Sequence, residues 1–178
     1  MGVCLSVIRV AIITLQSPDG MKDSDYIKLA IEQAKKSVDA GGFPAGAVIV
    51  KDGKVISEGI SVGFKQNDPS GHAESAAIRE ACKNINSFNL EGATLYESIE
   101  CCVMCFTTSY WAGISRIVYA CKKTPEMVSK QYYEGTTDNQ TLNRENNRQI
   151  ELVFDPSSEQ DSLNVIRTWE DEGGFDRK

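Results

Sequence analysis

The sequence has few positive charges and no cluster of them. Lys and Arg together number 19 against 25 Asp and Glu, which gives a formal net charge of -6 at pH 7. An acidic chain without a basic patch repels phosphate groups at long range. The composition, with an acidic stretch at 170–172, therefore argues against a nucleic-acid partner.

The chain also lacks an apolar run long enough to cross a membrane. Residues 3–15 are largely apolar, but the run is too short for a spanning helix and Arg9 interrupts it. The first six residues match a permissive myristoylation pattern without the usual basic flank. We therefore expect no membrane partner. Residues 1–20 are interpreted as an N-terminal extension, either an extra strand, a disordered lead or the result of an upstream start codon.

No convincing secretory signal precedes the six cysteines. Their spacing is irregular and two of them are adjacent, so we do not expect a disulfide framework. Cys82 and Cys121 are most simply small buried apolar residues. These features favour a reducing, cytoplasmic setting.

Hydrophobic periodicity predicts one α/β domain over residues 21–178, because the chain is long enough for one core and short for two. Helical spacing of apolar residues marks four helices, at 23–40, 72–85, 102–112 and 158–169. Strand-like runs occur at 47–50, 55–57, 93–96, 116–120 and 150–154. The turn at Asp52-Gly53 makes the first two strands a hairpin, and strands 93–96 and 116–120 with their intervening helix form a parallel crossover unit.

Helix starts and the polar stretch 124–149 give further expectations. We expect Asp23 or Ser24 to cap the first helix, and Asp68 or Ser70 to cap the second. The stretch 124–149 has few apolar residues and is predicted to be a loop-rich flap. Within it, Tyr132-Tyr133 either belong to a lid or pin the loop.

His72-Ala73-Glu74 and Cys102-Val103-Met104-Cys105 are the residues that indicate chemistry. Imidazole and thiolates bind zinc, and three protein ligands leave one coordination position for water. Cys102 and Cys105 are three apart at a helix start, where both sulfurs share a face and the helix dipole favours thiolates. His72 begins the preceding helix, so both helix starts can meet at the carboxyl edge of the sheet. We predict Zn2+ bound by His72, Cys102 and Cys105.

Glu74 is predicted to be the proton shuttle. It is two residues from His72 and cannot share its direction on the helix, so its carboxylate belongs beside the water rather than on the metal. Zinc lowers the pKa of its water to roughly 7. Glu74 would move a proton from that water to a ring nitrogen of the substrate and then help protonate the departing amino group. The expected reaction replaces an amino group with a carbonyl and releases ammonia.

Two other interpretations remain open. Cys101 could be a fourth ligand in a closed structural zinc site, although adjacent cysteines in extended backbone point opposite ways. A zinc-stabilised module that binds a ligand without turnover is also possible, but such a module has little use for Glu74.

These residues resemble the cytidine deaminase-like zinc deaminases, whose signature pairs H-x-E with P-C-x-x-C. The likeness is to the branch with guanine deaminases, tRNA adenosine deaminases and fungal-type cytosine deaminases, and it covers roughly residues 23–121. It is carried by the segments 46–50, 67–69, 72–74 and 94–96, by Glu100 and by 102–105.

The resemblance implies a three-layer α/β/α fold with a mixed five-stranded sheet and, usually, a homodimer. The substrate-binding residues that it implies are Ser61, Ala73, Cys101 and Trp169, the last on a helix that often closes such pockets. Two positions depart from the family pattern, because Cys101 replaces the usual Pro and Ser61 the usual Asn. A hydroxyl cannot offer the paired donor and acceptor of an amide.

The segment 67–69 favours guanine as the substrate through this resemblance. Cytosine, cytidine or another aminated heterocycle is the alternative. Because the acidic balance and the acidic stretch at 170–172 argue against a tRNA substrate, a free base or nucleoside is favoured and tRNA adenosine is less favoured.

Overall fold

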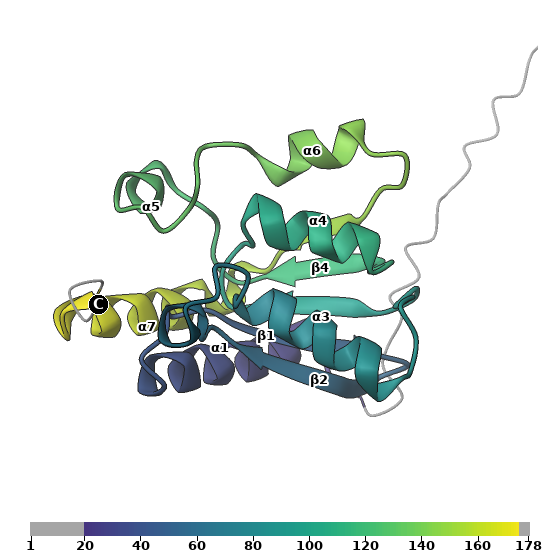
Figure 1. The fold of residues 1–178 in the computed structure, drawn as a ribbon, viewed down its shortest axis with the longest axis horizontal. Helices are drawn as coiled ribbons and strands as arrows, with labels where there is room; N and C mark the ends of the chain where they lie inside the picture. Colours follow the sequence, from purple (N-terminus) through teal and green to yellow (C-terminus); the bar gives the residue numbers. More distant parts are fainter. Residues whose placement is uncertain (1–19, 175–178) are drawn as a thin grey trace, which may run out of the picture.

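Five strands form one mixed sheet in the computed structural model, which describes residues 20–174 (Figure 1). The strands are β1 (Gly46–Lys51), β2 (Lys54–Ile60), β3 (Thr94–Glu97), β4 (Arg116–Tyr119) and β5 (Glu151–Phe154), in the spatial order β2-β1-β3-β4-β5. β1 runs antiparallel to β2 and β3, whereas β3, β4 and β5 are parallel. The expected mixed sheet and parallel crossover are confirmed. The extension predicted for residues 1–20 lies, apart from Gly20, outside the described residues.

Helices cover both faces of this sheet. The helices are α1 (Asp23–Asp39), α2 (Gly63–Gln66), α3 (Ala73–Asn84), α4 (Val103–Trp111), α5 (Pro125–Ser129), α6 (Asn139–Glu145) and α7 (Glu159–Asp171), with a 3-10 turn, η1 (Pro156–Ser158). Figure 1 shows α3 and α4 on one face and α1 and α7 on the other. Adjacent strand residues point to opposite faces, so Ile49 packs under α3 and α4 whereas Val48 packs against α1. The three-layer α/β/α fold is confirmed.

None of the helices between residues 20 and 174 combines the length and the apolar content that crossing a bilayer requires.

Two glycines allow the helices to approach the strands closely. A Cβ added at Gly59 of β2 would lie 2.0 Å from the carbonyl oxygen of Ala73, at the start of α3. A Cβ at Gly46 of β1 would lie 2.2 Å from the carbonyl oxygen of Ala30 in α1. Only glycine leaves room for this backbone contact. Gly59 therefore sets how near the N-terminal end of α3 lies to the sheet.

Both predicted helix caps are wrong. The N-cap of α1 is Lys22, and Asp23 instead accepts two hydrogen bonds from Arg116, at 2.9 and 2.7 Å, and one from the hydroxyl of Tyr96 at 2.8 Å. Ser24 lies inside the helix. Asp23 is thus used for a contact 93 residues away rather than for a local cap.

The second cap prediction fails for a local reason. The N-cap of α3 is His72. Asp68 accepts hydrogen bonds from the N–H (2.8 Å) and the hydroxyl (2.7 Å) of Ser70, so both side chains are used in the turn before the helix.

The Asp23 ion pair gives a stability prediction. Its hydrogen bonds from Arg116 lower the pKa of Asp23 below the ordinary 3.8. The carboxylate therefore contributes stability that is present above about pH 4 and is lost as the pH falls through the folded-state pKa. Because the side chains of Arg116 and Asp23 are 25% and 36% exposed, solvent screening limits this to about 1 kcal/mol. Asp23→Asn is expected to lower the Tm at pH 7 by about 2–4 °C and to flatten its fall on acidification. Asp39→Asn, at an exposed position of the same helix, is the control, and an equal acid dependence in both variants would contradict the assignment.

The flap predicted over 124–149 is more ordered than expected, because it contains α5 and α6. The hydroxyl of Thr124 accepts from the N–H of Met127, and Pro125 occupies the first turn of α5. Asp138 caps α6 by accepting from two backbone N–H groups. These caps, rather than apolar periodicity, start the two short helices.

Candidate active site

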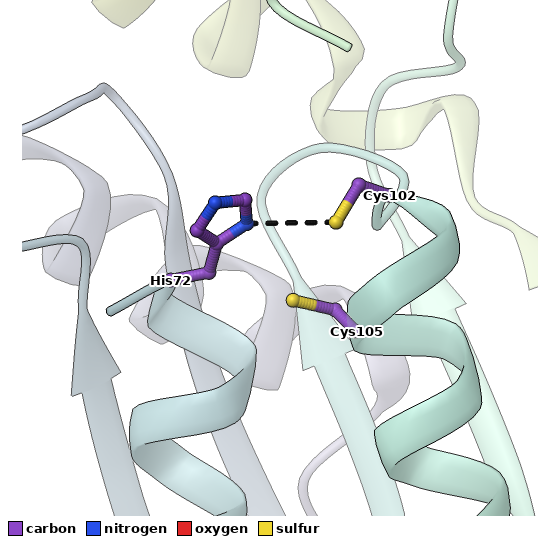
Figure 2. A group of neighbouring side chains, drawn as sticks. All are labelled: His72, Cys102 and Cys105. Atoms are coloured by element: carbon purple, nitrogen blue, oxygen red, sulfur yellow. Dashed lines mark hydrogen bonds between the residues drawn. The ribbon is translucent and has the colours of Figure 1, made fainter. Parts of the chain in front are cut away.

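Two helix N-termini meet at one edge of the sheet. His72 is the N-cap of α3, the second helix after β2, and Cys102 is the N-cap of α4, which follows β3. β2 and β3 run in the same direction because both are antiparallel to β1, which lies between them. Their carboxyl ends therefore bring the starts of α3 and α4 side by side (Figure 2).

Three side chains converge at this edge. One ligand atom from each of His72, Cys102 and Cys105 lies within 4.8 Å of the others, and the His72 Nδ1 to Cys102 Sγ distance is 3.5 Å (Figure 2). Ligands of a tetrahedral zinc ion lie roughly 3.5 Å from one another. The spacing and the nitrogen and sulfur donor set therefore fit zinc. Cys101 is not part of this group, which contradicts the alternative of a closed site with Cys101 as fourth ligand.

The two sulfurs differ in how readily they lose a proton. Hydrogen bonds with Cys105 and then with His72 lower the pKa of the Cys102 thiol, despite its burial. The hydrogen bond with Cys102, together with burial, raises the pKa of the Cys105 thiol. The hydrogen bond with Cys102 also raises the pKa of His72 against the effect of its burial. These shifts favour the thiolate form of Cys102 over that of Cys105, and a bound cation would stabilise both thiolates.

Glu74 lies directly beside His72, Cys102 and Cys105, the three-residue group. Its side chain is in the first turn of α3 and only 4% exposed, and its Oε2 accepts from the thiol of Cys105 at 3.4 Å. Burial is the main reason that the pKa of Glu74 is raised, and the nearby sulfur of Cys102 adds to it. A carboxyl group with a raised pKa can both accept and return a proton near neutral pH.

A cavity of about 830 Å³ opens above these residues. Its lining includes the aromatic side chains Phe43, Phe64, Tyr132 and Tyr133 and the acidic side chains Asp68, Glu74, Glu100 and Glu134. Among the described residues, no Lys or Arg lines it. The cavity therefore suits a flat, uncharged or cationic ligand and repels phosphate.

Comparison with known proteins identifies the family. Residues 21–121 match the family model described as the cytidine and deoxycytidylate deaminase zinc-binding region. The chain belongs to this family. The deaminase is 44% identical over 105 residues to the guanine deaminase of Bacillus subtilis (strain 168), a match that covers 58% of this chain and 67% of that protein. It is 37% identical over 95 residues to the tRNA-specific adenosine deaminase of Aquifex aeolicus, covering 53% of this chain and 63% of that protein.

A solved structure supports the same assignment. The guanine deaminase from Bacillus subtilis superposes with a TM-score of 0.58 at 33% identity, over 85% of this chain and 95% of that chain. The deaminase is thus a zinc-dependent hydrolase of the cytidine deaminase-like fold, as its sequence predicts.

The four residues expected to bind substrate occupy different places. Ser61 lines the cavity, and its N–H donates to the hydroxyl of Ser37 at 2.9 Å. Ala73 is completely buried in the core at the start of α3. Cys101 is 2% exposed and lies in the same core rather than in the cavity wall. Trp169 is 3% exposed and is not part of the cavity lining.

Trp169 packs against two aromatic residues of the cavity wall. Its ring centroid lies 5.3 Å from that of Phe43 and 5.6 Å from that of Tyr132, both in edge-on geometry. Phe43 and Tyr132 themselves line the cavity. Helix α7 therefore reaches the deaminase site through these two rings.

Glu134 is a site residue that the sequence analysis missed. It lines the cavity, and its Oε1 accepts from the N–H of Val103 at the start of α4, at 2.7 Å. Asn67, whose backbone is left-handed with φ 53°, lines the cavity as well. No sequence motif marks Glu134, because it is one acidic residue in a polar stretch.

Tyr132 and Tyr133 were expected either to belong to a lid or to pin the loop. Both line the cavity, and the hydroxyl of Tyr133 donates to the carbonyl of Glu100 at 2.6 Å.

Proposed function

We propose that this deaminase converts guanine to the corresponding carbonyl compound with release of ammonia. The observation that carries the proposal is the placement of Glu74 beside His72, Cys102 and Cys105, at the base of a cavity with aromatic and acidic walls. The 44% identity to a guanine deaminase supports the choice of base.

In this proposal, His72, Cys102 and Cys105 would hold a zinc ion. When bound, zinc would lower the pKa of a water molecule and so supply a nucleophile at neutral pH. Glu74 accepts a proton from the water, delivers it to the ring nitrogen beside the amino-bearing carbon, and then protonates the leaving amine. Water supplies the oxygen of the new carbonyl, and the amino group leaves as ammonia.

The other cavity residues orient the base and exclude solvent. Phe43 and Tyr132 offer aromatic surfaces against which a planar ring packs. The carboxylate of Glu134 is an acceptor for ring or exocyclic N–H groups, of which guanine has several. Ser61 offers a single hydroxyl in place of an amide. Recognition of the base therefore depends more on the carboxylate of Glu134 than on the side chain at position 61.

Adenosine in tRNA is the second candidate, because a tRNA-specific adenosine deaminase is 37% identical over its matched part. The net charge of -6 and the absence of Lys or Arg from the described cavity lining oppose it. Cytosine and other aminated heterocycles remain alternatives that the same chemistry would serve.

A substrate panel tests the proposal. Ammonia release is measured with zinc-loaded protein on guanine, cytosine, adenine, their nucleosides, guanosine 5′-monophosphate and a tRNA anticodon stem-loop. Because like charges brought together at a binding site cost several kcal/mol, we expect kcat/KM for guanine to exceed that for the monophosphate by at least about 100-fold. Comparable turnover of the monophosphate, or deamination of the stem-loop in preference to guanine, would refute the assignment.

We further propose a homodimer in the cytoplasm. Trp111 is 67% exposed and Met104 36% exposed, and the two are seven apart on α4, so they share one outward face. We propose that a second copy of this chain covers this face, and sedimentation velocity measures whether the protein is a dimer in solution.

The cytoplasmic location is supported by the cysteines. All five cysteines in the described part of the chain are free thiols, which supports a reducing compartment.

A further inference from the structure

Glu97 is an acidic residue in a place where an acid is unfavourable. It is the last residue of β3 and is completely buried. Its Oε2 accepts from the N–H of Cys101 at 3.1 Å, whereas its Oε1 has no hydrogen-bond partner among the described residues. A buried carboxyl group with an unsatisfied oxygen costs free energy. Stability of the core therefore does not explain why Glu97 is there.

Asn139 is a second buried polar residue that bonds to Cys101. It is the first residue of α6 and is 2% exposed. Its Nδ2 donates to the carbonyl oxygen of Cys101 at 2.8 Å and to Oε1 of Glu100 at 3.3 Å. Its Oδ1, like Oε1 of Glu97, has no partner among residues 20–174. Two buried side chains thus hold Cys101 by its N–H and its carbonyl group.

The held carbonyl group belongs to the peptide plane that leads into Cys102. Because a peptide unit is planar, fixing its oxygen fixes the position of the next backbone nitrogen. Cys102 is the N-cap of α4, with φ -71° and ψ 168°, and its carbonyl accepts from the N–H of Phe106 at 2.9 Å. The helix therefore holds the C-terminal side of Cys102, and the peptide plane from Cys101 constrains its N-terminal side. Cys105 lies within α4, whose backbone hydrogen bonds already hold it.

We propose that Glu97 and Asn139 are positioning residues that hold Cys101 by its backbone and so place the sulfur of Cys102 for metal binding. The proposal rests on the zinc-ligand role of Cys102 in the proposed function. It explains why two costly buried polar side chains meet at Cys101, and it connects α6 to the metal site.

Zinc release from the full-length, zinc-loaded protein tests the proposal without any substrate. The variants are Asn139→Ala and, as a matched control, Asn143→Ala. Asn143 is a buried residue of the same helix, but its side chain bonds to the N–H and carbonyl of Ile150, away from the metal. Both variants are expected to lower the Tm. Only Asn139→Ala is expected to speed zinc loss to a chelator, by about tenfold, as for other residues that orient metal ligands.

Glu97 is tested in the same assay with two substitutions. Glu97→Val removes the acceptor and is expected to speed zinc release by about tenfold. Glu97→Gln keeps an acceptor oxygen for the N–H of Cys101 and is expected to restore release to within about threefold of the starting protein. If Glu97→Val does not fold, the comparison of Asn139→Ala with Asn143→Ala decides.

Equal zinc release from Asn139→Ala and Asn143→Ala would overturn the proposal. Faster release from Asn139→Ala alone would support it, even if no base in the substrate panel were turned over. That second result would reject the guanine assignment and leave the positioning role standing, so the two failures are distinguishable.

Discussion

Glu74→Gln is expected to lower kcat for ammonia release by about 10²- to 10⁴-fold and to leave the zinc content unchanged. Glutamine has nearly the same volume and keeps an oxygen beside the metal group, but it cannot take up and return a proton. The effect is large because Glu74, buried beside Cys105, is the carboxyl group that contacts the three-residue group. The measurements are steady-state ammonia release and metal analysis of the same preparation.

Glu58→Gln is the control for this substitution. Glu58 lies on β2 and is 44% exposed, and it accepts from Gln33 at 2.6 Å, outside the cavity. We expect its variant to keep full activity. If Glu74→Gln retained most of its turnover, the proton-shuttle role would be wrong. If it lost zinc as well as activity, Glu74 would have to be reassigned as a ligand.

Cys102→Ala is expected to weaken zinc binding by about 10²- to 10³-fold and to abolish deamination. Structural zinc sites with four protein ligands bind the ion with roughly 10–16 kcal/mol, which is about 2.5–4 kcal/mol per ligand. A loss of that size corresponds to the expected fold-change in affinity. Cys105→Ala and His72→Ala are expected to behave alike, because the ligand atoms of all three residues lie within 4.8 Å of one another. Competition with a chromogenic chelator measures the affinity.

Cys101→Ala and Cys121→Ala are the matched controls, since both remove a buried thiol. Alanine at 101 keeps the backbone N–H and carbonyl that Glu97 and Asn139 hold, so zinc affinity is expected to stay near that of the starting protein. A large loss of zinc in Cys101→Ala would restore the closed four-ligand site. Unchanged affinity in Cys102→Ala would remove Cys102 from the metal site.

The convergence of His72, Cys102 and Cys105 was predictable because its signals are local. Cys102 and Cys105 share a helix start, and His72 begins the preceding helix. The spacing of these residue types therefore indicates that their side chains point to one place. The sheet was predictable for a similar reason, because apolar runs such as β1 and β3 are short and bounded by turn residues. Both predictions need only neighbours in sequence and the rule that parallel strands align their ends.

The remainder depends on contacts between distant residues, which no local pattern encodes. Asp23 resembles a helix cap, but a partner 93 residues away binds it. Glu134 reaches the cavity because Tyr133 and Asn139 on either side of it bond to the loop before α4. No apolar periodicity marks the helices α5 and α6, because polar caps start them and few apolar residues lie within them.

Gly59 shows how the packing of the sheet enters the chemistry. The backbone of β2 touches α3 at the residue that follows His72, so no side chain separates the strand from the metal-binding end of the helix. A larger residue at position 59 would shift His72, whereas Cys102, the N-cap of α4, and Cys105, within α4, would stay in place. Gly59 therefore affects how well the metal centre tolerates mutation, although it does not contact the ion. Variants of this hairpin would first have to retain the metal before any change in substrate preference could be selected.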